Sequence, residues 1–283
     1  MEGDSGGPLS EELGELSLSA HYQTIYTVIS SESSLIVFIM TIISLLLLAS
    51  LLPHLTFTVN GTEAKPHSRP YMVSVQLNKK HICGGFLISD EFVLTAGHCR
   101  EGTQILTVVI GAHDLRNSKN SDRIGVQFYI PHPSYKIHLP WNDIMLLRLQ
   151  EKVNLNNYVE WISLPKKGED VEVNTCSVAG WGKLCTNCQK SDCLMEANVH
   201  IMNNSECQKR WGWMFSDSQM MCTHGHGGSC IGDSGGPLVC GNTAVGVTIF
   251  GYKFLCNSPV KPNVYIKISP YIPWINRIIR NVK

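Results

Sequence analysis

The chain is poor in charged residues. Only 16% of its 283 residues carry charge, 23 Lys and Arg balance 23 Asp and Glu, and no Lys or Arg occurs before Lys65. A protein that binds nucleic acid or another polyanion would need a basic run or stripe, and none appears. We therefore expect no nucleic-acid partner. The hydrophobic content of 43% is sufficient for a folded core.

A complete zinc motif is also missing. Cys185 and Cys188 have the spacing of a zinc-ligand pair and Cys193 follows, but no second such pair or nearby His pair completes the set. We therefore expect no metal ion and no cofactor. The chain has eleven cysteines, at mostly wide spacings after residue 82. This pattern indicates a disulfide framework formed in an oxidising compartment.

An uncharged apolar run spans residues 35–52. Its length suits a membrane helix and also the apolar part of a signal peptide. The cytoplasmic flank of a membrane anchor is usually basic, and the flank before this run is not. We expect residues 35–57 to be a signal peptide and short propeptide of a secreted or granule-stored protein, with Met40 as the functional start. Membrane anchoring through an uncleaved 35–52 is the alternative, and residues 1–34 are expected to be a disordered acidic extension.

The sequence after residue 60 indicates an all-β fold. Short apolar runs, several of them alternating or β-branched, are separated by Gly, Pro, Asn and Asp, as in a sandwich or barrel. The predicted strands are Tyr71–Leu77, Phe86–Ile88, Phe92–Thr95, Leu106–Ile110, Ile144–Leu149, Ser177–Ala179, Leu238–Cys240 and Ala244–Phe250. At the end of the chain apolar residues recur at helical spacing from Tyr271 to Ile279, which predicts a C-terminal helix.

Three local motifs carry residues suited to nucleophilic catalysis. LTAGHC contains His98, NDIMLLRL contains Asp143, and GDSGGPLVC contains Ser234. A serine hydroxyl is a weak nucleophile at neutral pH and needs an imidazole to take its proton. An aspartate can hold that imidazole in the required tautomer. The letters GDSGGPL also occur at residues 3–9, but Ser5 has no histidine in its own segment and is not expected to be a nucleophile.

These motifs, in the order His, Asp, Ser, resemble the chymotrypsin-like serine protease family over Val59–Lys283. VAGWGK and LPKKGEDV are similar to the granzyme and mast-cell protease branch, and GVTIFG is similar to granzymes A and K. The resemblance implies a domain over 58–283 made of two packed six-stranded antiparallel β-barrels with a C-terminal α-helix. It also implies a serine endopeptidase that needs no cofactor, with polypeptide substrates and protein protease inhibitors as partners.

The family's pattern assigns further roles. It implies an oxyanion hole formed by the N–H groups of Gly232 and Ser234. It also implies an activation ion pair between Asp233 and the amine of Thr58, freed by cleavage. The implied disulfides are Cys83–Cys99, Cys176–Cys240, Cys207–Cys222 and Cys230–Cys256. Three cysteines are left over, namely Cys185, Cys188 and Cys193. This odd number leaves one of them free or paired between chains.

The chain departs from the family around its expected mature N-terminus. Thr58 is followed by Val59, Asn60 and Gly61, where Ile-Ile-Gly-Gly is usual. Asn60 and Asn203 each begin a glycosylation sequon. A glycan on Asn60 would lie two residues from Thr58, whose freed amine must insert to pair with Asp233. We therefore expect Asn60 glycosylation and full activation to exclude one another.

The expected substrate pocket also departs from the family. Gly228 stands where trypsin-like members have an Asp, so we expect no preference for Arg or Lys. Gly251 leaves one wall of the pocket open. Asn263, on another wall, should narrow the pocket and make it polar. Ile249 stands where a serine usually supports the triad aspartate. These differences motivate the alternative that the chain is a poorly activated or inactive homologue that binds peptides or inhibitors without efficient turnover.

Overall fold

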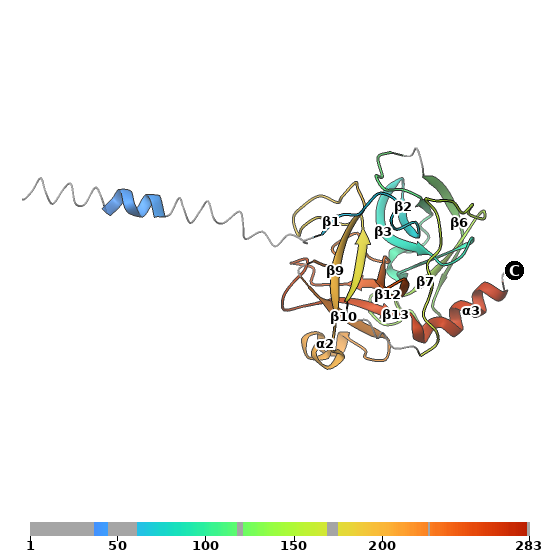
Figure 1. Cartoon of the computed structure of the whole chain (residues 1–283). Helices are drawn as coiled ribbons and strands as arrows, with labels where there is room; N and C mark the ends of the chain where they lie inside the picture. Colours follow the sequence, from blue (N-terminus) through green and yellow to red (C-terminus); the bar gives the residue numbers. More distant parts are fainter. Residues whose placement is uncertain (1–36, 45–60, 118–120, 169–174, 226, 282–283) are drawn as a thin grey trace, which may run out of the picture. The chain divides into compact units, whose positions relative to one another are not determined.

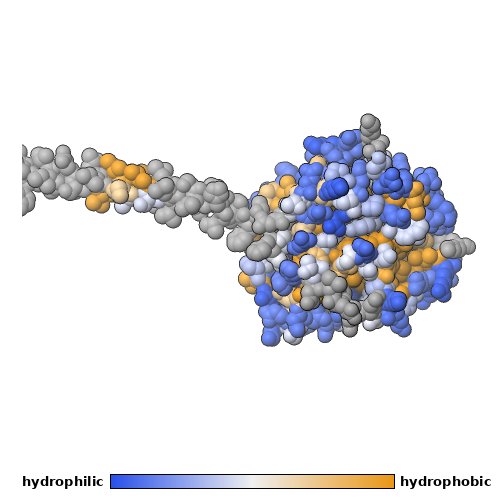
Figure 2. Space-filling model, in the orientation of Figure 1, coloured by the Kyte–Doolittle hydropathy of each residue, from blue (hydrophilic) through white to orange (hydrophobic). Residues whose placement is uncertain are grey.

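The computed structural model describes residues 37–44, 61–117, 121–168, 175–225 and 227–281. The chain divides into two units, residues 1–56 and 57–283. In the first unit the described residues form a short helix with exposed apolar side chains (Figures 1 and 2). No helix in the described part of the chain is long and apolar enough to cross a membrane. The predicted extension 1–34, and the predicted leader 35–57 apart from its short helix, lie outside the described residues.

The first half of the second unit is a closed antiparallel barrel in the order β2-β3-β4-β7-β6-β5. Its strands are β2 (Met72–Leu77), β3 (Lys80–Leu87), β4 (Phe92–Thr95), β5 (Leu106–Ile110), β6 (Asp122–Pro131) and β7 (Met145–Leu149). β2 is buried on both faces. Val73 and Val75 belong to the hydrophobic core, while Ser74 and Gln76 are also buried. Because successive side chains of a strand point to opposite faces, Ser74 and Gln76 face away from the core of their own barrel.

The second half forms another closed barrel, in the order β9-β10-β13-β12-β11-β8, which the pairing of β8 with β9 completes. Its strands are β8 (Thr175–Gly180), β9 (Met195–Met202), β10 (Met220–His224), β11 (Pro237–Cys240), β12 (Thr243–Phe250) and β13 (Asn263–Lys267). The short strand β1 (Thr62–Glu63) pairs with the start of β9. Figure 1 shows the two barrels packed side by side, with both halves of the chain contributing to one core. The predicted fold of two packed six-stranded barrels is confirmed.

The predicted C-terminal helix is also confirmed, as α3 (Ile272–Asn281). It follows a short 3-10 helix, η4 (Ser269–Tyr271). Trp274 and Ile275 are buried in the core cluster that the two barrels share. Pro273 lies in the first turn, where the N–H that proline lacks would have no partner within the helix. The helix is therefore held by its apolar face.

All eleven cysteines lie in the described part of the chain, and ten of them form disulfides. Four are the disulfides that the family resemblance implied: Cys83–Cys99, Cys176–Cys240, Cys207–Cys222 and Cys230–Cys256. The fifth joins Cys185 to Cys188, which removes this pair as a zinc-ligand motif. Cys193 is a free thiol.

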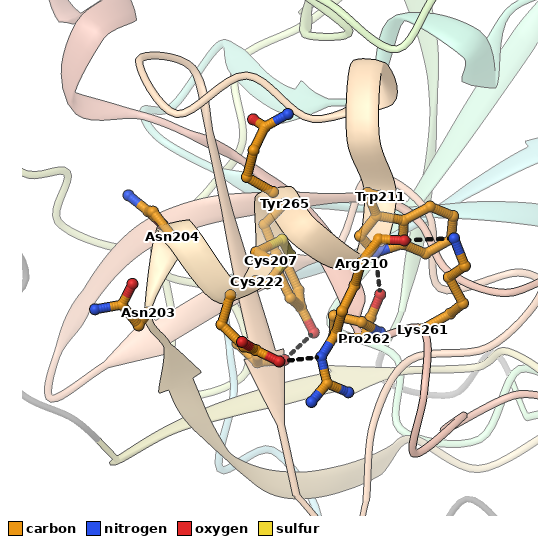
Figure 3. Close-up of a disulfide and its surroundings, with 12 residues drawn as sticks. Asn203, Asn204, Cys207, Arg210, Trp211, Cys222, Lys261, Pro262 and Tyr265 are labelled. Carbon is orange, nitrogen blue, oxygen red and sulfur yellow. Dashed lines mark hydrogen bonds and ion pairs between the residues drawn. A yellow bond between two sulfur atoms is a disulfide. The ribbon is translucent and has the colours of Figure 1, made fainter.

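One disulfide joins a helix that the sequence analysis did not predict, α2 (Asn204–Trp211), to strand β10 (Figure 3). The indole N–H of Trp211 donates to the carbonyl of Pro262 at 3.1 Å, so the helix is held at its middle by the disulfide and at its last residue by this bond. Asn203 is exposed at the helix start, and its side-chain oxygen accepts the Ser205 N–H at 2.8 Å. The Asn203 sequon is therefore accessible, and its glycosylation stays a prediction.

Candidate active site

Two of the three predicted catalytic side chains are joined by a short hydrogen bond at the end of the first barrel. β4 and β7 pair in a register that sets Thr95 opposite Met145. His98, just after β4, and Asp143, just before β7, are therefore neighbours. Nδ1 of His98 donates to Oδ2 of Asp143 at 2.6 Å, and the backbone N–H of His98 donates to Oδ1 at 2.8 Å. These two bonds fix the imidazole with its Nδ1 face toward the carboxylate.

The electrostatics of this pair favour the protonated imidazole. Burial disfavours a positive charge on His98, but the hydrogen bond and the negative charge of Asp143 outweigh it. The pKa of His98 therefore lies above its ordinary value. Asp143 itself is only 5% exposed. A buried carboxylate with a hydrogen bond to each oxygen is suited to stabilise an imidazolium.

Ser234 comes from the second barrel, in the turn before β11. The Gly235 N–H donates to the carbonyl of Thr248 at 2.7 Å, which ties this turn to β12. The Gly84 N–H, on β3 of the first barrel, donates to the carbonyl of Ser234 at 2.8 Å. Ser234 and His98 line one cleft between the barrels. The structure thus brings the predicted nucleophile to the same cleft as the His98–Asp143 pair.

The predicted oxyanion donors flank the buried Asp233. Gly232 has a φ of +106°, a conformation that residues with a side chain rarely adopt. Among the described residues, no acceptor binds the N–H of Gly232 or of Ser234.

A buried chain of hydrogen bonds holds the carbonyl of Gly232, and the sequence analysis missed it. Nε2 of His81 lies 2.9 Å from that carbonyl, and its Nδ1 lies 2.9 Å from the Ser74 hydroxyl. Gln76 donates to the same hydroxyl at 3.0 Å. Because the carbonyl only accepts, Nε2 carries the proton and Nδ1 accepts from Ser74. Burial lowers the pKa of His81 to about 4, so the ring stays neutral and keeps this tautomer.

Asp233 is buried and holds two backbone groups. Its carboxylate accepts the N–H of Gly182 and the N–H of Cys230, each at 2.8 Å. Burial raises the pKa of Asp233 to about 6, although these two bonds and the charge of Lys190 act in the opposite direction. No cation in the described part of the chain lies within ion-pair distance of this carboxylate. Thr58 and Asn60 lie outside the described residues, so the predicted ion pair is not tested.

Three of the predicted substrate-binding residues lie together, and two of them, Gly251 and Asn263, line the cleft that holds His98 and Ser234. The side chain of Asn263 is 8% exposed and donates to the carbonyl of Ser229 at 3.0 Å. Its amide lies between Gly228 and Gly251, since a Cβ on either glycine would come within 2.5 Å of it. Asn263 therefore occupies the space that these two glycines leave. Ile249, on β12, is 3% exposed and has no hydroxyl to offer Asp143.

Comparison with known proteins agrees with this geometry. The sequence model of the trypsin family matches residues 58–275. Granzyme F of Mus musculus is 40% identical over 228 residues, which cover 77% of this chain and 90% of that protein. Mast cell protease 3 of Ovis aries is 39% identical over 232 residues, covering 80% of this chain and 90% of that protein.

A solved structure gives the same assignment. Neuropsin, a serine protease expressed in the limbic system of mouse brain, superimposes with a TM-score of 0.72 at 34% identity, covering 78% of this chain and 99% of that one. The likeness therefore spans both barrels and the cleft between them. This chain belongs to the trypsin family of serine endopeptidases, and its relatives include granzymes and mast cell proteases.

Proposed function

We propose that the chain hydrolyses peptide bonds through an acyl-enzyme, with Ser234 as nucleophile, His98 as general base and acid, and Asp143 as the group that orients His98. The observation that carries this proposal is the 2.6 Å bond between His98 and Asp143 beside a cleft that Ser234 also lines. With Nδ1 committed to Asp143, the lone pair of Nε2 is available to take the serine proton.

The reaction follows from these positions. Oγ of Ser234 attacks the scissile carbonyl while Nε2 of His98 accepts the hydroxyl proton. The carbonyl oxygen becomes an oxyanion, which the N–H groups of Gly232 and Ser234 stabilise; loss of one such donor typically costs about 3 kcal/mol. The imidazolium then gives its proton to the leaving amine. Water then attacks the acyl carbonyl and gives a proton to His98, which passes a proton to Oγ of Ser234 as the acyl group leaves as a carboxylic acid.

We infer a substrate pocket for small side chains. Gly228 supplies no carboxylate, so the positive charge of Arg or Lys would have no partner there. The amide of Asn263 lies against both Gly228 and Gly251 and narrows the pocket between them. A short P1 side chain fits above this amide. A long or aromatic side chain would have to displace a buried, hydrogen-bonded group.

We also infer that the chain becomes active on cleavage before Thr58. Gly61 and Asp233 line the same small pocket, and Gly61 is three residues after Thr58 in the sequence. A free amine inserted there would pair with a buried carboxylate that has no cation partner among the described residues. Secretion, polypeptide substrates and binding of protein inhibitors belong to the same proposal.

One observation favours the alternative, a homologue that binds peptides or inhibitors with little turnover. Within the described residues, both hydrogen bonds to the carboxylate of Asp143 come from His98. Ile249 supplies no third donor, and the loss of a hydrogen bond to a buried group costs about 1–3 kcal/mol. Replacement of Ile249 by Ser would raise kcat if this missing donor limits the enzyme.

We expect Ser234→Ala to abolish labelling by a fluorophosphonate, because the reagent needs the nucleophile that His98 activates. The chain provides a matched control, since Ser5 lies in an identical GDSGGPL segment. After cleavage before Thr58, mass spectrometry should find the label on the 58–283 fragment of wild type and of Ser5→Ala. Labelling that survives Ser234→Ala, or the absence of labelling in cleaved wild type, would contradict the proposed enzyme.

We expect Asn263→Gly to open the pocket. A peptide library should show kcat/KM rising about tenfold or more for large apolar P1 residues, with no comparable gain for Arg or Lys. The control is Asn263→Asp, which keeps the volume of the side chain. It should leave large apolar P1 residues excluded. Equal gains in both variants, or a wild-type preference for Arg or Lys, would show that Asn263 does not limit the pocket in this way.

We expect Asp233 to make the uncleaved chain less stable as the pH rises from about 4 to about 6. Its folded-state pKa of about 6 exceeds 3.8, the ordinary pKa of an aspartate, so between these pH values the folded chain holds a proton that the unfolded chain releases. This group stabilises the fold fully below the lower pKa, and that stabilisation is lost above pH 6. Two pKa units correspond to about 3 kcal/mol.

Urea unfolding at several pH values would measure this effect as the difference between wild type and Asp233→Asn, which cannot ionise. The difference in unfolding free energy should change with pH in the uncleaved chain. In the cleaved chain an inserted amine would favour the ionised form and remove the trend. A difference that is constant with pH in the uncleaved chain would refute the buried, unpaired state of Asp233.

A further inference from the structure

Three side chains with different ligand chemistry meet away from the catalytic cleft. They are Glu63 on β1, His113 after β5, and Cys193 before β9. One ligand atom from each lies within 4.8 Å of the other two. Nε2 of His113 and Oε1 of Glu63 are 2.8 Å apart. A carboxylate, an imidazole and a thiol are the three kinds of protein ligand that zinc accepts.

Backbone hydrogen bonds hold the three segments side by side. The N–H of Leu194 donates to the carbonyl of His113, and the N–H of Ala64 donates to the carbonyl of Leu194, each at 2.9 Å. His113 takes part in these bonds directly. Glu63 and Cys193 are the residues just before Ala64 and Leu194 in the sequence. The Ser191 hydroxyl also donates to the carbonyl of Cys193 at 2.6 Å. The three side chains are therefore brought together by the fold, before any ligand binds.

Neither Cys193 nor His113 has its bonding capacity filled. The other ten cysteines form disulfides, which leaves Cys193 as a thiol. His113 has a side chain that is 13% exposed, and its Nδ1 is buried without a hydrogen-bond partner in the described part of the chain. Nε2 is the ring nitrogen that faces Glu63, so it is the nitrogen that could share a cation with that carboxylate.

The surroundings of this cluster are negative. Asp114 and Asp192 flank it, in addition to Glu63. Arg116 pairs with Asp114 at 2.8 Å and with Asp192 at 3.5 Å. A divalent cation would offset this negative charge and stabilise the thiolate.

We propose that Glu63, His113 and Cys193 form a zinc-binding site. Tetrahedral zinc with ligand distances of about 2.0–2.3 Å needs its ligand atoms about 3.5 Å apart, which small side-chain rotations provide here. Water completes the fourth position. The set differs from the Cys185–Cys188 motif seen in the sequence, because that pair forms a disulfide.

Cobalt(II) titration of the full chain carrying Ser234→Ala, which prevents self-cleavage, tests this site. We expect one cobalt per chain, with a thiolate-to-cobalt charge-transfer band and the visible bands of tetrahedral cobalt. Zinc should displace the cobalt and bleach both. Cys193→Ser should abolish the charge-transfer band, and Glu63→Gln should weaken zinc binding by about tenfold or more. The exposed position of Glu63 makes Glu63→Gln a variant that can fold.

The matched control is His200→Gln, which removes an exposed imidazole 5.8 Å from the ring of His224, a second place where zinc could bind adventitiously. This variant should bind cobalt as the parent chain does. The absence of a charge-transfer band in a folded chain would overturn the site, as would detection of Cys193 in a disulfide between chains. Because the readout is metal binding alone, failure here is distinct from failure of the proposed peptidase.

Discussion

The close backbone contact between the two barrels determines where the catalytic groups meet. Gly84 of β3 donates its N–H to the carbonyl of Ser234 at 2.8 Å. A Cβ at Gly84 would come within 3.1 Å of the backbone of Gly236, so a side chain there would push the barrels apart. His98 and Asp143 belong to one barrel and Ser234 to the other. This contact therefore holds the nucleophile's turn against the barrel that carries His98 and Asp143.

Burial and neighbouring groups then give His98, His81 and Asp233 different protonation states. The pKa of His98 lies above its ordinary value because the hydrogen bond and charge of Asp143 outweigh the effect of burial on the imidazole. His81 stays neutral because nothing negative compensates for its burial, and it can therefore hold the Gly232 carbonyl in one orientation. Asp233 is buried with two backbone donors and favours its protonated form. The proposed cleavage supplies the missing positive charge, which links processing of the chain to the shape of the oxyanion hole.

The sequence was informative where the functional residues belong to short contiguous motifs. The motifs around His98, Asp143 and Ser234, and the wide cysteine spacings, led to the fold, the family and four disulfides. Several strands were not predicted, among them β9 and β13. The alternating apolar and polar residues of β9 could have identified it, whereas β13 is short and almost entirely buried, so its residues do not alternate. The role of His81 was also hidden. It contacts Gly232, which lies 151 residues away, and no local motif marks either its burial or its bond to Ser74. The cluster of Glu63, His113 and Cys193 is likewise made by three distant segments.

The crystal structure of the cleaved chain with a phosphonate bound covalently in the cleft would test the central claim most directly. The account predicts a bond from phosphorus to Oγ of Ser234, a phosphoryl oxygen within hydrogen-bond distance of the N–H groups of Gly232 and Ser234, and Nε2 of His98 beside Oγ. A phosphonate bound to another residue, or a phosphoryl oxygen turned away from both N–H groups, would contradict it.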